Sequence, residues 1–214
     1  MKSLVFDFDG TLCCSKELIK KAFGDAMEKY GPKDITDEQV KACFGPNESG
    51  ILLKIVGEEK HHDAFFEYLK SYNENHDKLL TGFFPGIEEL LKRLKEEGYT
   101  IYLLTGRSVE STMISLTKFN AFKYFDDTYF GDLKGSVKDR RLLELCKDHH
   151  LNPEDLLYIG DSPKDVIQCR KVGVQIISVK YDNFESSEEL YSLNTGMVAE
   201  NVANLVYLIN KYGK

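Results

Sequence analysis

The sequence predicts a doubly wound parallel α/β sheet with a helical cap domain inserted after the first strand. Short apolar runs rich in Val, Ile, Leu and Tyr indicate buried strands, and stretches with helical periodicity separate most of them. This alternation is typical of a parallel α/β sheet. The cap is predicted because a long helical region without any strand-like run follows the first strand.

The expected strands and helices alternate along most of the chain. We expect strands at SLVFDF (3–8), YTIYLLT (99–105), LLYIGD (156–161) and VQIISV (174–179). Helices are expected at PGIEELLKRLKEEG, between Pro85 and a stop at Gly98, at KDRRLLELCKDHHL and at SPKDVIQCRKVG. A last amphipathic helix at 201–212 is expected to dock on the sheet.

The region from Ser15 to about Thr81 shows only helical periodicity. Its first apolar face ends at Gly31, and TDEQ at 36–39 resembles a capping box, a pairing that often begins a helix. About 65 residues are too many for a simple crossover, which usually needs little more than a dozen. We therefore expect an α/β core formed by residues 1–14 and 82–214, and a helical cap formed by residues 15–81.

Charge and cysteine content disfavour several classes of protein. The 214 residues carry a net charge of −7 and the 28 basic residues are scattered, so neither nucleic acid nor a membrane is the expected partner. The five cysteines show no disulfide or metal-ligand spacing, which favours a reducing cytoplasm. No signal peptide or membrane-spanning run is expected, and we expect a cytoplasmic monomer or homodimer.

Polar residues gather where the expected strands end. In open parallel sheets, ligands bind outside the carboxyl ends of the strands. The residues expected there are Asp7, Asp9, Gly10 and Thr11, then Thr105, Gly106 and Arg107, and finally Asp161 and Asp165, with Lys134 or Lys138 close by. Taken singly, Asp161 or Asp165 could serve only as a helix N-cap. Burying Asp7 and Asp9 together is costly without a cation, and Mg2+ is the natural one.

Four motifs, in this order, resemble the haloacid dehalogenase superfamily: DFDGTL, LLTGRS, a lysine and GDSPKD. The resemblance is to its phosphatases with a helical cap, such as phosphoglycolate phosphatase, and it implies Mg2+-dependent hydrolysis of small phosphorylated metabolites. It implies that Asp7 is the nucleophile that becomes an aspartyl phosphate, and that Asp9 is the general acid and base. The implied Mg2+ ligands are Asp7, Asp9 through its backbone carbonyl, Asp161 and Asp165.

The resemblance also implies which groups bind the phosphoryl oxygens. Thr105 would be a catalytic hydrogen-bond donor, and a lysine would balance the negative charge. Lys138 is preferred to Lys134 for this lysine because it would open the following helix. The expected substrate-binding residues are Gly10, Thr11, Gly106 and Arg107.

Several alternatives stay open at this point. Asp9 argues against carbon–halogen chemistry, because the family's dehalogenases lack an acid there, but a sugar-phosphate mutase and a pyrophosphatase of the family remain. Outside the enzymes, a phospho-acceptor signalling module combines similar residues, although receiver domains are shorter and lack the insert.

The loop 44–49 offers specificity candidates at Gly45, Pro46 and Asn47. The histidine pairs at 61–62 and 149–150 are expected on the surface.

Overall fold

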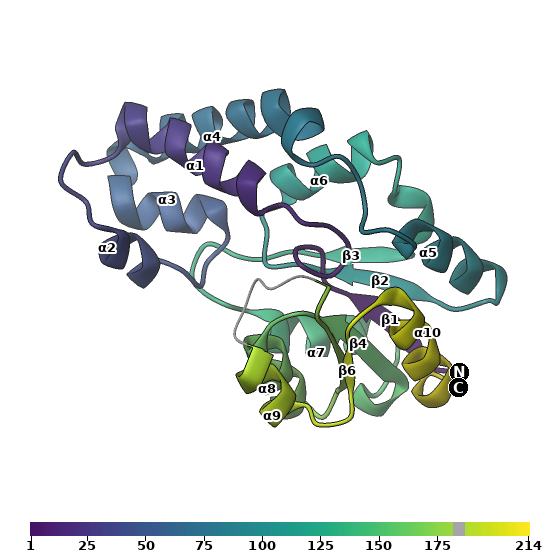
Figure 1. The fold of residues 1–214 in the computed structure, drawn as a ribbon. Helices are drawn as coiled ribbons and strands as arrows, with labels where there is room; N and C mark the ends of the chain where they lie inside the picture. The colour runs from purple at the N-terminus through teal and green to yellow at the C-terminus, as the bar shows by residue number, and fades with distance from the viewer. Residues whose placement is uncertain (182–186) are drawn as a thin grey trace.

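A six-stranded parallel sheet forms the centre of the computed structural model, which describes residues 1–181 and 187–214 (Figure 1). The strands are β1 (Ser3–Phe6), β2 (Ile101–Leu104), β3 (Asp127–Tyr129), β4 (Leu156–Gly160), β5 (Gln175–Val179) and β6 (Val198–Ala199). They pair in the order β3-β2-β1-β4-β5-β6, and every pair is parallel. The predicted parallel α/β sheet is confirmed, and the end of β1 lies where the strand order reverses, the usual ligand position in such sheets.

Helices cover both faces of this sheet. Helices α7 (Lys138–Asp148), α8 (Pro163–Lys171) and α9 (Ser187–Leu193) pack on one face, and α5 (Ile87–Glu96) and α10 (Val202–Tyr212) pack on the other. Side chains alternate along a strand, so Val5 of β1 packs on the face covered by α7, α8 and α9. Leu4 and Phe6 pack on the opposite face, covered by α5 and α10. Because β1 is buried on both faces, its sequence is an uninterrupted apolar run. The doubly wound arrangement and the docking of the last helix are confirmed.

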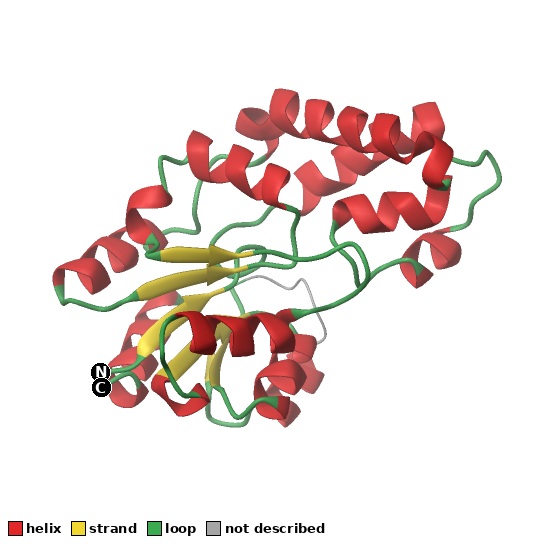
Figure 2. Ribbon diagram, turned by 180° about the vertical axis from the view of Figure 1, so that it is seen from behind, coloured by secondary structure: helices red, strands yellow, loops and turns green. Residues whose placement is uncertain are grey.

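Four helices fill the region in which no strand was expected: α1 (Lys16–Tyr30), α2 (Asp37–Ala42), α3 (Glu48–Val56) and α4 (Glu58–Leu79). We call them the helical insert. They form a layer beyond the carboxyl ends of the strands, with α1 packed along α4 (Figure 1, Figure 2). Helix α1 ends at Gly31. The predicted capping box is present, since Thr36 and Gln39 exchange hydrogen bonds of 2.8 and 3.3 Å.

Four strands and helices of the described core were not predicted: β3, β6, helix α6 (Val109–Lys118) and helix α9. Strands β3 and β6 form the two edges of the sheet and are only three and two residues long, so neither needs an apolar run. Helix α6 is rich in Ser and Thr, and its start is fixed by the Ser108 side chain, which accepts a hydrogen bond from the N–H of Ser111. Short 3-10 turns occur at Phe122–Tyr124 and Pro153–Asp155.

Among the described residues, none of the helices has the length and apolar character that crossing a bilayer requires.

Candidate active site

The chain turns sharply directly after β1, in the segment that carries Asp7 and Asp9. The N–H of Phe8 donates to Oδ1 of Asp7 at 2.8 Å, which fixes the Asp7 carboxylate at the strand end. Gly10 has a φ of +71°, which L side chains rarely adopt. A Cβ at this position would also lie 2.0 Å from Oδ2 of Asp161. Glycine therefore allows the loop both its turn and its close approach to the end of β4.

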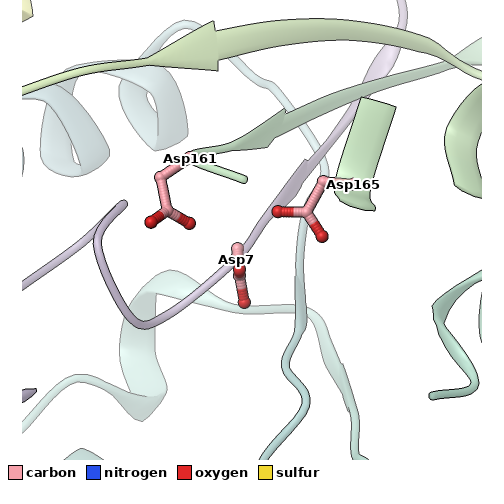
Figure 3. Close-up of side chains that lie close together, drawn as sticks. All are labelled: Asp7, Asp161 and Asp165. Carbon is pink, nitrogen blue, oxygen red and sulfur yellow. The ribbon is translucent and has the colours of Figure 1, made fainter. Parts of the chain in front are cut away.

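Three carboxylates meet at the ends of β1 and β4, and we call Asp7, Asp161 and Asp165 the acid cluster (Figure 3). Each contributes an oxygen, and these oxygens lie within 4.8 Å of one another. Asp161 follows β4 directly, whereas Asp165 lies in the first turn of α8. The N-cap of α8 is Ser162, and Asp165 completes the capping box, so neither acid is the N-cap itself. Asp165 thus both caps the start of α8 and contributes its carboxylate to the acid cluster.

Lys138, the first residue of α7, reaches into the acid cluster. Its Nζ lies 2.6 Å from Oδ2 of Asp7 and 2.7 Å from Oδ1 of Asp165. Lys134 lies elsewhere: the residue is exposed, and its backbone N–H donates to Oδ1 of Asp132 at 2.7 Å. Of the two lysines considered from the sequence, Lys138 is therefore the one that the fold brings to the strand ends.

The acid cluster is crowded with negative charge. Burial raises the pKa of Asp7 to about 7, against the lowering effect of Lys138. Burial and the neighbouring Asp7 also raise the pKa of Asp161 well above its usual value. Desolvation disfavours the charge of Lys138, yet Asp165 and Asp7 hold its pKa well above the ordinary value. One ammonium cannot balance three ionised carboxylates, and the remaining charge together with the hard oxygen donors suits Mg2+.

Asp9 does not join the acid cluster. Its carboxylate pairs with Arg107 in a two-pronged geometry, with Nε 2.8 Å from Oδ2 and Nη2 2.5 Å from Oδ1. Ser15 also donates to Oδ1 of Asp9. Arg107 is only 3% exposed, although 36% of the Asp9 side chain is exposed. The two acids of the first motif therefore have separate cationic partners.

The residues expected to bind a phosphoryl group lie beside these carboxylates. Thr105 is 1% exposed, and its Oγ1 accepts a hydrogen bond of 3.2 Å from the N–H of Arg107. The hydroxyl of Thr11 is buried and has no hydrogen-bond partner in the described part of the chain. The carbonyl of Gly106 lies against Gly131, where a Cβ would come within 2.0 Å of it. The loops after β2 and β3 are thus closely packed against each other.

Comparison with known proteins identifies the family. The model of haloacid dehalogenase-like hydrolases matches residues 4–179. The chain belongs to this family. It is 31% identical over 186 residues to a protein of Caldanaerobacter subterraneus named "Putative pyrophosphatase PpaX", covering 84% of this chain and 81% of the relative. It is 24% identical to a phosphoglycolate phosphatase of Nitrosospira multiformis, over 99% of this chain and 96% of the relative.

Solved structures of the haloacid dehalogenase-like hydrolases share the fold. One, described as a predicted phosphatase from Clostridium acetobutylicum, has a TM-score of 0.76 at 27% identity and covers 98% of both chains. The resemblance seen in the four sequence motifs is therefore confirmed. A receiver-type signalling module, the alternative from outside the enzymes, does not account for these matches.

Sequence reasoning missed the residues that join the helical insert of this hydrolase to its core. Glu48, the first residue of α3, is 5% exposed and accepts hydrogen bonds of 2.6 Å from both the N–H of Ser108 and Oγ of Ser111. His76 of α4 is fully buried, and its Nε2 lies 3.1 Å from Oγ of Ser115. His76 stands in no motif, and Glu48 lies in the loop 44–49 but is not one of the three residues singled out there. The only available signal was a charged or polar residue on an otherwise apolar helix face.

The loop at 44–49 lies against the core of the hydrolase. Asn47 donates its N–H to the carbonyl of Asp132 at 2.9 Å, and its side chain caps α3 by accepting from the N–H of Gly50. The backbone N–H and the side-chain Oδ1 of Asn47 are thus already used within the protein. As for the histidine pairs, His61 contacts Ser49 and His149 contacts Asp127. Within the described residues, no group of three potential metal ligands contains a histidine.

Proposed function

We propose that this hydrolase is a Mg2+-dependent phosphatase of small phosphorylated metabolites that acts through an aspartyl phosphate on Asp7. The observation that carries the proposal is the acid cluster, in which a buried carboxylate at a strand end is crowded by two further acids and contacted by one lysine. A carboxylate attacks a negatively charged phosphoryl group only where cations offset the repulsion. Among the described residues, Lys138 is the cation that contacts the acid cluster, and the carboxylate oxygens could bind a metal cation as well.

Asp7, Asp161 and Asp165 are the side chains that would hold the cation, with the backbone carbonyl of Asp9 as the fourth proposed ligand. When bound, Mg2+ supplies positive charge that offsets the carboxylates and the phosphoryl oxygens. Lys138 supplies further positive charge to the same carboxylates, since it contacts both Asp7 and Asp165. In this arrangement Lys138 holds the Asp7 carboxylate in one orientation at the end of β1.

The proposed reaction has two steps. An oxygen of Asp7 bonds to phosphorus while the bond from phosphorus to the leaving oxygen breaks, and Asp9 gives that oxygen its proton. Asp9 then takes a proton from water, whose oxygen attacks phosphorus and releases phosphate from Asp7. The hydroxyl of Thr105 and the amide of Gly106 are the proposed donors to the phosphoryl oxygens. Gly10 and Thr11 form the loop that the phosphoryl group would approach.

A pyrophosphatase is the second candidate. It is favoured by the relative with 31% identity, whose name assigns it pyrophosphate as substrate. The same acid cluster serves either substrate, because the attacking carboxylate and the transferred phosphoryl group are the same in both reactions. Discrimination between substrates then depends on the helical insert rather than on the strand ends.

The test is turnover of p-nitrophenyl phosphate with Mg2+, followed by a panel containing phosphoglycolate, pyrophosphate and a hexose 1-phosphate. We expect phosphate release that a chelator abolishes and that Asp7→Asn eliminates. Radiolabelled phosphoryl donor should tag the wild-type protein but not Asp7→Asn. Conversion of the hexose 1-phosphate to its 6-phosphate without phosphate release would instead identify a mutase. Chelator-resistant turnover would refute the proposed site.

A further inference from the structure

Arg107 occupies an unusual place for a residue that was expected to contact substrate. Its guanidinium is buried, and the hydrogen-bond partners found for it within the described residues are Asp9, Tyr72 and Ser115. We propose that Arg107 is a positioning residue for Asp9, and that Tyr72 links its placement to helix α4 of the helical insert. This inference rests on the proposed function, which gives Asp9 its role in proton transfer.

The Asp9 carboxylate is held in one orientation. A carboxylate in a loop can rotate about two side-chain bonds, and proton transfer needs one defined orientation. Arg107 holds both oxygens of Asp9 through its planar fork, and Ser15 adds a hydrogen bond to Oδ1. Such a two-pronged pair fixes the plane of the carboxylate as well as its distance. The contacts therefore select one orientation of Asp9 among several.

Arg107 is itself fixed by two aromatic rings and two hydroxyl groups. Its Cζ lies 4.5 Å from the centre of the Phe8 ring and 5.3 Å from that of Tyr72. The Nη1 atom, which is not used for Asp9, donates to the hydroxyl of Tyr72 and, at 3.2 Å, to Oγ of Ser115. The part of the guanidinium that does not contact Asp9 is thus held by aromatic rings and by hydrogen bonds to hydroxyl groups.

The contacts of Arg107 and Asp9 come from both the helical insert and the core. Tyr72 belongs to α4 of the helical insert, whereas Ser115 belongs to α6 of the core. The Tyr72 hydroxyl also lies 2.7 Å from Oγ of Ser115, so that it bridges the two helices. Ser15, the other residue on Asp9, directly precedes α1. A displacement of α4 from α6 would separate Tyr72 from Arg107 and Ser115. Asp9 is therefore oriented by contacts that depend on the placement of the helical insert.

The central experiment compares Tyr72→Phe with Tyr68→Phe. Both tyrosines lie on α4 and are fully buried, but the hydroxyl of Tyr68 contacts Glu48, at 3.4 Å, instead of Arg107. Each substitution removes one hydroxyl and keeps the ring. We expect Tyr72→Phe to lower kcat about three- to tenfold with KM changed less than twofold, the effect of losing one ordinary net hydrogen bond, because Ser115 still accepts from the same Arg107 nitrogen. Tyr68→Phe should change neither constant by more than twofold.

A second experiment addresses Arg107 directly. Arg107→Ala should lower kcat by about a hundredfold, and added guanidinium ion should restore part of it, since a small fork-shaped cation can reoccupy the place beside Asp9. Arg107→Lys should not restore activity, because an ammonium cannot engage both oxygens in one plane. Guanidinium should not rescue Asp9→Ala. If Arg107→Ala fails to fold, the comparison of Tyr72→Phe with Tyr68→Phe decides the matter.

A measurement without turnover separates this inference from the proposed function. The Nε–H resonance of Arg107, assigned by its loss in Arg107→Lys, should shift and exchange faster with water in Tyr72→Phe but not in Tyr68→Phe. A wild-type protein inactive on the whole panel would refute the phosphatase proposal, while the resonance still tests the coupling. Equal effects of the two Tyr→Phe variants on kcat and on the resonance, or a folded Arg107→Ala with unchanged kcat, would overturn the role of Arg107.

Discussion

Asp7→Asn should stabilise the metal-free protein at alkaline pH while it removes activity. In the folded protein, burial raises the pKa of Asp7 from 3.8 to about 7. Between about pH 4 and 7, the folded protein therefore keeps a proton that the unfolded chain loses, and the free energy of unfolding falls as the pH rises through this window. Asparagine resembles the protonated acid in shape and charge. The variant should therefore lack this part of the pH dependence.

The magnitude follows from the displacement of about three pKa units, which corresponds to about 4 kcal/mol at pH 8 as an upper limit. Lys138 loses one of its two carboxylate partners in the variant, which offsets part of the gain. Only about two of these pKa units fall between pH 5 and pH 8, so we expect the unfolding free energies of the two proteins to change by amounts that differ by about 1–3 kcal/mol over this range. Urea unfolding in the presence of chelator measures it.

Two controls define this measurement. Asp63→Asn removes a carboxylate that is 69% exposed and lies outside the acid cluster, so its pH dependence should follow that of the wild type. Adding Mg2+ at pH 8 should raise the unfolding free energy of the wild type more than that of Asp7→Asn, because the variant lacks one charged ligand. Parallel pH dependences for wild type and Asp7→Asn would refute the claim that Asp7 is held protonated by its surroundings.

Three further outcomes are expected. Asp9→Asn should slow both formation and hydrolysis of the phosphoenzyme by about a hundredfold or more, measured by rapid quench; an unaffected hydrolysis step would contradict its role as base. Lys138→Ala should lose most activity while Lys134→Ala keeps it, and equal mild losses would contradict the assignment. Gly10→Ala should weaken Mg2+ binding far more than Gly98→Ala in a thermal shift assay, because both have positive φ but only Gly10 lacks room for a Cβ.

The fold was predictable where burial leaves a pattern in the sequence. Strands β1, β2, β4 and β5 are buried on both faces and appear as apolar runs, and α5 and α10 show one apolar stripe each. The edge strands β3 and β6 were missed because two or three residues, partly exposed, carry no such pattern. Helix α6 was missed because its buried face includes Ser111, Thr112 and Ser115, whose hydroxyls find partners inside the protein.

The candidate site was predictable only in part, for a related reason. Residues at strand ends, such as Asp7 and Asp161, are positioned by the sheet itself. The motifs and their order in the chain were enough to identify them as candidate site residues. Glu48 and Tyr72 reach the same region from α3 and α4, and their role depends on how the helical insert packs over the core. Nothing in local spacing encodes that packing. Contacts between distant segments therefore remained invisible in the sequence.

The structure also explains how two like charges can stand two residues apart. Their carboxylates have different partners: Asp7 contacts Lys138, whereas Asp9 contacts Arg107 beneath the helical insert. Each acid of the first motif thus has a cation of its own. Asp165 shares Lys138 with Asp7, and no second lysine pairs with the acid cluster in the described part of the chain, so the cluster keeps a negative charge whenever its members ionise. That residual charge, rather than the pair of acids in the motif, is what a divalent cation would neutralise.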